Sequence, residues 1–262
     1  MEQQSISFPC QLPSRGRLYN GKVPGGNITV LPLRGEQEEV LSAAEGEESL
    51  KMLRHLTEQL IVLPKDFPFS ELLITDWFAA TLAIMCTSFA VSTIPLEPTC
   101  PKCKESSVQE KSIDALDCVT GDDMGDTYQE PFKVGKRLPV SGAKIEFCLH
   151  RMRDLEKIEN FAEQYARKRK QGHRVGNPST TYGLALQIFS INGDPHMADS
   201  DKHRWVRDAV WGDLQVIRTE IQTKETGFDL RPEFKCPSCG GGFRVLIPLN
   251  FLRLFSPGPG LD

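Results

Sequence analysis

Two short pairs of cysteines are the residues of this chain whose types and spacing predict chemistry. Cys100 and Cys103 enclose Pro-Lys, and Cys236 and Cys239 enclose Pro-Ser. A gap of two residues lets both thiols of a tight turn face one point, and two such turns supply the four thiolates that Zn²⁺ prefers. The spacing therefore predicts a four-cysteine zinc site formed by Cys100, Cys103, Cys236 and Cys239.

The distance between the two pairs along the chain is unusual for such a site. About 130 residues separate them, whereas the pairs of a zinc ribbon are normally about 15–20 residues apart. The metal would thus join two parts of the fold that are remote in sequence. Gly240 after the second pair suits a turn around sulfur, because glycine adopts left-handed backbone angles, whereas Lys104 after the first pair suits it less.

An alternative interpretation is that the pairs are two unrelated Cys-x-x-Cys turns, one or both of them a redox dithiol. The chain has no thioredoxin-like βαβ pattern around either pair, and the presence of two matched pairs favours zinc. Four thiolates leave no open coordination position for a substrate, so we expect a structural ion rather than a catalytic one.

The composition is that of an ordinary soluble globular protein. The chain has 262 residues, 39% of them hydrophobic and 25% charged, with a net charge of −4. A slightly acidic chain argues against a dedicated nucleic-acid binder, which usually carries a clear positive excess. The remaining cysteines are scattered in apolar contexts, so we expect reduced core thiols and folding in a reducing cytoplasm. They are Cys10, Cys86, Cys118 and Cys148.

Residues 77–96 carry no charge over a length that approaches a membrane span. Several hydroxyl side chains interrupt this stretch, and Pro95 closes it. We therefore predict a buried core helix of about 17 residues and no membrane segment. The N-terminal residues 1–9 have neither the basic nor the apolar region of a signal peptide.

The predicted fold class is α+β, mostly helical with short strands. Leu-Pro-x-x-Gly occurs at residues 12–16 and again at 138–142. Each copy precedes a predicted strand, at 28–33 and at 144–149, and then a short polar turn and an acidic helix. We therefore predict two repeated strand-helix units, joined by the split four-cysteine site, which is similar to a zinc ribbon.

The chain divides into five predicted segments. In order, they are an extended arm, a strand with helices that include the core helix, the first knuckle with an acidic loop, the second strand-helix unit, and the second knuckle with the tail. Their limits are 1–27, 28–99, 100–135, 136–235 and 236–262. Within them, periodicity predicts a strand at 113–119 and helices at 184–191 and 202–223.

No motif of an enzyme active site is found in the sequence. There is no nucleophile elbow, phosphate-binding loop or dinucleotide glycine pattern, and the five histidines are not spaced as metal ligands. Residues 167–170 form a cationic run, with His173 and Arg174 beyond it. These cations could contact nucleic acid, but we favour a solvated helix end whose positive charges complement the helix dipole.

The order of these features resembles one known family. A Leu-Pro-Ser-x-Gly arm, an apolar helix beginning at residues 72–76 and a Cys-Pro-x-Cys knuckle are followed by a second Leu-Pro-x-Ser-Gly strand. An Ile-Asn-Gly turn at 191–193, the second knuckle and an apolar-proline tail complete the series. From about Leu12 to Pro257 the chain resembles the baseplate hub family of T4-type contractile-tailed bacteriophages, whose members are hub components or hub assembly chaperones.

The resemblance implies a non-enzymatic role in building the phage tail hub, with other baseplate hub or tail proteins as partners and no catalytic residues. It implies a location in the host cell cytoplasm during assembly, or in the virion tail baseplate. We expect the arm at 1–27 and the tail at 249–262 to order against these partners, because exposed apolar residues such as Phe8 and Phe255 need cover. The alternative is a zinc-ribbon nucleic-acid-binding protein that uses residues 167–174.

Overall fold

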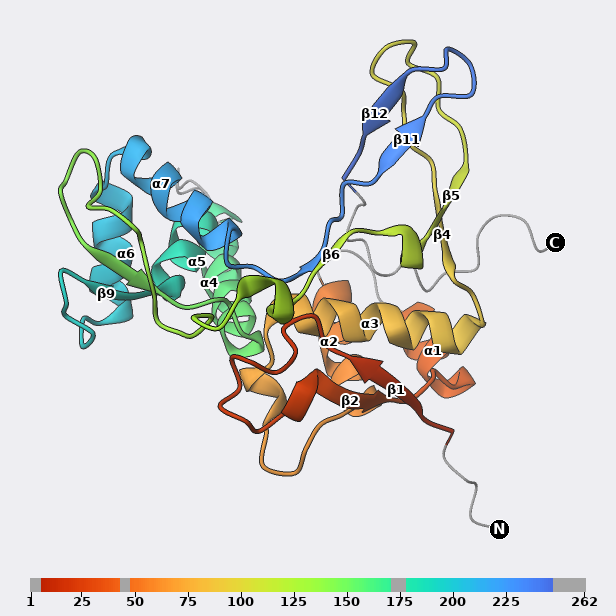
Figure 1. Ribbon diagram of the computed structural model, residues 1–262, viewed down its shortest axis with the longest axis horizontal. Coiled ribbons are helices and arrows are strands. Elements are labelled where there is room, and N and C mark those ends of the chain that lie inside the picture. The colour runs from red at the N-terminus through yellow and green to blue at the C-terminus, as the bar shows by residue number, and fades with distance from the viewer. Residues whose placement is uncertain (1–5, 43–47, 171–177, 247–262) are drawn as a thin grey trace.

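The computed structural model describes residues 6–42, 48–170 and 178–246 of the chain. It combines helices with small antiparallel sheets, in agreement with the predicted α+β class. Figure 1 shows two groups of helices and strands, with a pair of hairpins that projects away from them. Buried apolar side chains of the two groups form one connected core.

The N-terminal group contains three strands and three helices. They are β1 Phe8–Gln11, β2 Asn27–Val30, β3 Ile61–Val62, α1 Gly35–Ser42, α2 Glu48–Leu60 and α3 Ile74–Phe89. The strands pair antiparallel in the order β1-β2-β3. Helices α1 and α2 connect β2 to β3, and α3 follows β3 and lies at the centre of the molecule in Figure 1.

The second group is built in the same order. Its elements are β7 Phe132–Lys133, β8 Ile145–Phe147, β9 Ile188–Ile191, α4 Met152–Lys170, α5 Ser179–Gln187, α6 Asp199–Asp208 and α7 Trp211–Gln222. The strands again form an antiparallel sheet, in the order β7-β8-β9. Helices α4 and α5 connect β8 to β9, and α6 and α7 follow.

Both groups therefore place a Leu-Pro loop between their first two strands and a pair of helices before the third. We call residues 12–16 the first Leu-Pro loop and residues 138–142 the second Leu-Pro loop. The shared topology is compatible with two strand-helix units of one design. That the units are copies of one ancestral unit stays a prediction.

The segment before residue 28 contains strand β1 and then mostly turns, and it is not a free arm. Strand β1 pairs with β2, and Phe8 is half-buried and packs against the core. Leu12 and Val23 are fully buried, and Tyr19 is nearly so. The expectation that this arm becomes ordered only against a partner protein is therefore wrong from Phe8 onward. Its apolar side chains are already packed against other residues of the same chain. The tail at 249–262 lies outside the described residues.

The uncharged stretch forms a buried helix, as predicted. Helix α3 runs from Ile74 to Phe89, and Trp77, Leu82 and Ile84 on it are almost completely buried. It ends at Ala90, whose left-handed backbone (φ 52°) turns the chain toward the hairpins. None of the helices in the described residues combines the length and the hydrophobicity that crossing a bilayer requires.

Three predicted elements have different boundaries in the structure. The helix expected at 184–191 stops at Gln187, because Ile188–Ile191 pairs with β8 as a strand. The helix expected at 202–223 is two helices, since the backbone is extended at Ala209 and Val210. Only the end of the strand expected at 113–119 exists, where β6 (Cys118–Val119) pairs with β10 (Gly227–Phe228).

Candidate metal centre

Two β-hairpins carry the cysteine pairs. The first contains β4 Thr93–Leu96 and β5 Gln109–Ser112, and the second contains β11 Glu233–Lys235 and β12 Gly242–Arg244. Each hairpin is antiparallel and has one cysteine pair in its connecting turn. Figure 1 shows both hairpins projecting from the helical part, with the two turns together at their ends. We call this pair of hairpins the ribbon.

The two turns have the same backbone hydrogen bonds. The N–H of Cys100 donates to the carbonyl of Glu105 (2.8 Å), and the N–H of Lys104 donates to the carbonyl of Cys100 (2.9 Å). In the second turn, the N–H of Cys236 donates to Gly241 (3.0 Å), and Gly240 donates to Cys236 (2.9 Å). This shared knuckle geometry turns both sulfurs of each pair to the same side.

The four sulfurs form one compact cluster. All of them lie within 4.8 Å of one another, with Cys100 Sγ 3.8 Å from Cys239 Sγ and Cys103 Sγ 3.5 Å from Cys236 Sγ. A tetrahedron with Zn–S bonds of about 2.3 Å has S–S edges of about 3.8 Å. A disulfide would bring two sulfurs to about 2.05 Å. The distances therefore fit a shared tetrahedral ion and not a disulfide.

Burial and protonation differ between the members of each pair. Cys100 and Cys236 are buried, whereas Cys103 and Cys239 are exposed at the end of the ribbon. The backbone N–H of Cys239 lowers the pKa of the Cys236 thiol to about 6. The backbone N–H of Glu105 also favours the Cys103 thiolate, but the adjacent sulfur of Cys236 and burial raise its pKa to about 12. Sulfurs so close share their protons, and binding of a divalent cation displaces them.

Contacts between the hairpins hold the knuckles in place. Lys111 Nζ on β5 donates to the carbonyl oxygen of Glu233 on β11 (3.2 Å) and lies 5.9 Å from the ring centre of Phe234. The Phe234 ring is buried and packs against Phe243 of the neighbouring strand, with ring centres 6.0 Å apart. These contacts join the two hairpins below the cysteine turns.

The structure thus brings together the four cysteines that the sequence singled out. The other four are also free thiols, and they are half-buried, so they are less buried than the core thiols that the sequence predicts. Burial raises the pKa of Cys10 to about 11 and of Cys148 to about 12, so these thiols stay protonated at neutral pH. Within the described residues, the four cysteines of the ribbon are the one cluster of potential metal ligands.

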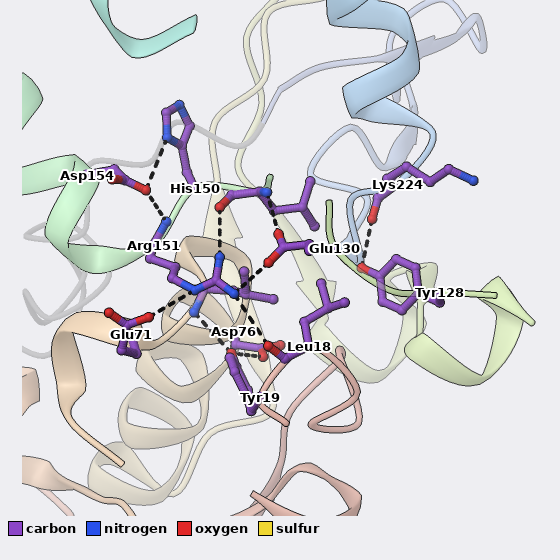
Figure 2. A network of polar contacts seen from close by, with 12 residues as sticks. Leu18, Tyr19, Glu71, Asp76, Tyr128, Glu130, His150, Arg151, Asp154 and Lys224 are labelled. Carbon is purple, nitrogen blue, oxygen red and sulfur yellow. Dashed lines mark hydrogen bonds and ion pairs between the residues drawn. The ribbon is translucent and has the colours of Figure 1, made fainter. Parts of the chain in front are cut away.

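A buried ionic network near the first Leu-Pro loop was not foreseen from the sequence. Figure 2 shows Arg151 at its centre, between Glu71 and Glu130. Arg151 Nη2 donates to Glu130 Oε2 (2.6 Å), and its Nε lies 3.3 Å from Glu71 Oε2. Further donations go to the carbonyls of Leu149 (3.3 Å) and Leu18 (3.4 Å). Burial opposes the charge of Arg151, but Glu130 outweighs it and raises the pKa of Arg151. A guanidinium with this many partners has a structural role, because it joins residues from distant parts of the chain.

Two buried aspartates hold the Leu-Pro loops. Asp76 and Asp213 are each the third residue of their helix and are both fully buried. Asp76 Oδ1 accepts from the Ser14 N–H (2.9 Å), and its Oδ2 accepts from the hydroxyls of Ser14 and Tyr19. Asp213 accepts from the N–H groups of Val140 and Ser141, both at 2.9 Å. In the sequence, an acidic residue in the first turn of a helix was the only signal for these contacts. The sequence did not indicate which loop each aspartate would bind.

A mostly apolar cavity of about 580 Å³ lies beside α3 and β10. Ile74, Phe78, Leu155 and Phe228 contribute to its lining. Glu225 also lines it, and burial raises the pKa of that carboxyl. The cavity has no clustered nucleophile, base or metal ligand among its lining residues, so we assign it no chemistry.

The cationic run can be placed only in part. Arg167 on α4 is exposed, and its Nη2 lies 3.8 Å from Glu163 Oε2. His173 and Arg174 lie outside the described residues. The ribbon itself is close to neutral: residues 93–112 contain three lysines and three glutamates, and residues 229–244 contain three cations and two acids.

Comparisons with protein-family models, curated proteins and solved structures found no match for this chain. The likeness to the baseplate hub family is therefore a resemblance in the order of short motifs, and its functional implications are proposals.

Proposed function

We propose that this protein is a non-enzymatic assembly component of a T4-type phage baseplate hub, whose fold is locked by one structural zinc ion. The zinc part depends on one observation, the clustering of the sulfurs of Cys100, Cys103, Cys236 and Cys239 within 4.8 Å. The assembly part depends on the motif order that resembles the hub family.

Zinc is the ion that best suits the four sulfurs. Thiolates are soft ligands, and a tetrahedral set of four selects Zn²⁺ or iron–sulfur chemistry. The Cys103–Cys236 and Cys100–Cys239 sulfur distances, 3.5 and 3.8 Å, match the edges of a tetrahedron around one ion. A site with four protein ligands has no position for a substrate or an activated water, which supports a structural role.

The ion would act as a clamp between distant parts of the chain. The hairpin that carries Cys100 leaves α3, whereas the hairpin that carries Cys236 follows α7 and β10. Closing so long a loop costs conformational entropy, and the free energy of metal binding offsets this cost in the folded state. The result would be a rigid body that presents fixed surfaces to other hub or tail proteins, with no small-molecule substrate.

The proposed setting is the host cell cytoplasm during tail assembly, with the virion baseplate as the final location if the protein stays. Mass spectrometry of purified phage particles would separate a hub component from a chaperone that leaves. For the hub role itself, the tagged full chain should capture baseplate hub proteins from infected cells. Capture of none would contradict that role.

The metal part is tested on the isolated protein. Elemental analysis of protein purified without added metal should give about one zinc per chain, and Cys236→Ser should reduce this to background. A metal-free preparation with unchanged stability would contradict the structural zinc.

The second candidate, a zinc-ribbon nucleic-acid binder, has weaker support. The near balance of charges on the ribbon favours a protein partner, since nucleic-acid sites carry a positive excess. A DNA or RNA mobility shift that falls steeply with salt would favour this candidate over the hub role.

A further inference from the structure

The two Leu-Pro loops are anchored alike but differ in what covers them. In the first loop the Ser14 N–H donates to the buried Asp76, and in the second the N–H groups of Val140 and Ser141 donate to the buried Asp213. In the first loop Pro13 and Ser14 are buried, whereas in the second loop Pro139 and Val140 are exposed. The same local construction is therefore closed in one half of the molecule and open in the other.

An acidic segment of the chain itself covers the first Leu-Pro loop. The N–H of Gly121 donates to the carbonyl of Pro13 (2.8 Å), and the Gly121 carbonyl accepts from Arg17 Nη1 (2.8 Å). A Cβ at Gly121 would lie 2.2 Å from the Ser14 carbonyl oxygen, so the two backbones are in direct contact. Arg15 lies 3.3 Å from Asp122, and this ion pair adds a charge contact between the two segments. Residues 117–126, which include four aspartates, form this cover.

In the part of the chain that the structure describes, no segment covers the second Leu-Pro loop in this way. Among the residues that the structure describes, none donates a hydrogen bond to the carbonyl of Pro139. Val140 is 61% exposed, Val210 is 53% exposed and Trp211 is 65% exposed. Val140 and α7 are adjacent, because the Val140 N–H donates to Asp213. These exposed residues therefore lie near one another, and Figure 1 shows α7 on the left, away from the ribbon.

The open face also has cations near it, as the first loop does. Lys136 and Arg137 precede the second Leu-Pro loop and are exposed, and the Arg218 guanidinium lies 4.9 Å from the centre of the Trp211 ring. At the first loop, arginines pair with the aspartates of the covering segment. An exposed tryptophan with a neighbouring arginine is also the composition that concentrates binding energy in protein interfaces.

We propose that the face formed by Pro139, Val140, Val210 and Trp211 binds an extended acidic segment of a partner protein, in the way that residues 117–126 cover the first Leu-Pro loop. The bound segment would donate a backbone N–H to the Pro139 carbonyl at a glycine, place an apolar side chain on Trp211 and direct carboxylates toward Lys136 and Arg137. This inference deepens the proposed assembly role by naming a surface for a partner, and it does not depend on the metal.

The probe is a labelled synthetic peptide with the sequence of residues 113–126, in which serine replaces Cys118. Fluorescence anisotropy with the zinc-loaded full chain should show saturable binding with a Kd on the order of 100 µM. Trp211→Ala should weaken it about tenfold or more, with unchanged circular dichroism because the side chain is exposed. Val108→Ala is the matched control: Val108 is 72% exposed on the ribbon, and this variant should bind the peptide normally.

A second peptide, with valine in place of the glycine that corresponds to Gly121, should bind much more weakly if the backbones approach as closely as they do at the first loop. Absence of binding by the original peptide, or equal binding by Trp211→Ala, would overturn the inference. A dimer in sedimentation that becomes a monomer with Trp211→Ala would assign the face to a second copy instead. Truncation after Leu246 that strengthens peptide binding would assign it to the chain's own C-terminal residues.

The outcomes for this face and for the hub role are separable. Peptide binding that requires Trp211, in a chain that captures no hub protein, would keep this inference and remove the proposed function. If the chain captures hub proteins equally well with Trp211→Ala and does not bind the peptide, the proposed function stands and this inference fails.

Discussion

Lys104 and Gly240 occupy equivalent positions in the two knuckles, and both have a left-handed backbone, with φ of 64° and 70°. Each follows the second cysteine of its pair and donates its N–H to the carbonyl of the first, Cys100 or Cys236. Glycine adopts this conformation freely, whereas a residue with a Cβ pays about 1 kcal/mol for it. The first knuckle therefore has the same shape as the second at a higher conformational cost.

Lys104→Gly should tighten metal binding. Removing the strain of about 1 kcal/mol corresponds to an affinity gain of up to about fivefold. Competition with a zinc chelator measures it, and Gly240→Ala is the matched control, which should weaken binding by a similar factor. A weaker site in Lys104→Gly would mean that the lysine side chain contributes more than its backbone costs.

Cys236→Ser should remove the metal and lower the thermal midpoint of unfolding. The serine hydroxyl is a poor ligand for zinc at neutral pH, and the remaining three thiols would stay crowded without an ion. Zinc content and calorimetry provide the measurements. Cys148→Ser is the control, because Cys148 lies outside the cluster, and it should keep its zinc. Equal zinc content in the two variants would exclude the proposed ligand set.

Gly121→Ala should destabilise the fold by about 3 kcal/mol, the upper part of the range for forced overpacking. The new Cβ would meet the Ser14 carbonyl oxygen at 2.2 Å, and that oxygen belongs to a residue whose backbone N–H is bonded to Asp76. Urea unfolding measures the change. Gly35→Ala, where a Cβ meets nothing within 4 Å, should be within about 0.5 kcal/mol of the parent chain.

Asp213 should make stability fall in acid. Burial opposes its charge, but the donors at Val140 and Ser141 outweigh burial and hold its pKa below the usual value. A lowered pKa in the folded state adds stability that is present above about pH 4 and is lost as the pH falls through the folded pKa. Asp213→Asn should therefore cost about 2 kcal/mol at pH 7 and less at pH 3, in unfolding experiments at both pH values. An equal loss of stability at pH 7 and pH 3 would contradict a lowered pKa for Asp213 in the folded state.

Asp76 should behave in the opposite way. Burial raises its pKa more than the hydrogen bonds from Ser14 and Tyr19 lower it. Its ionised form is therefore disfavoured in the fold, and its contribution to stability decreases as the pH rises through the raised pKa. Asp76→Asn should cost less at pH 7 than Asp213→Asn, because the Ser14 and Tyr19 hydroxyls can rotate to suit an amide. A larger cost for Asp76→Asn in the same urea series would show that Asp76 is ionised and tightly bound.

The site was more predictable than the rest of the fold. Cysteine chemistry and a two-residue gap are local properties, so the four ligands could be named from the sequence alone. The end of helix α5 at Gln187 could not be predicted from the sequence, because residues 188–191 become a strand only through pairing with β8. Likewise, Lys104 has no sequence signal for a left-handed backbone, and its conformation follows from the knuckle hydrogen bonds.

By itself, the sequence determined the α+β class, the buried helix around Trp77 and the cysteines that meet at the ribbon, because side-chain type and periodicity settle these locally. Only the tertiary structure decided that the segment from Phe8 to Gly26 packs against the core and is not a free arm. It also decided that Arg151 pairs with Glu71 and Glu130, and that one Leu-Pro loop is covered while the other is open. Burial depends on which distant residues pack nearby, and that information is not contained in any short stretch of the chain.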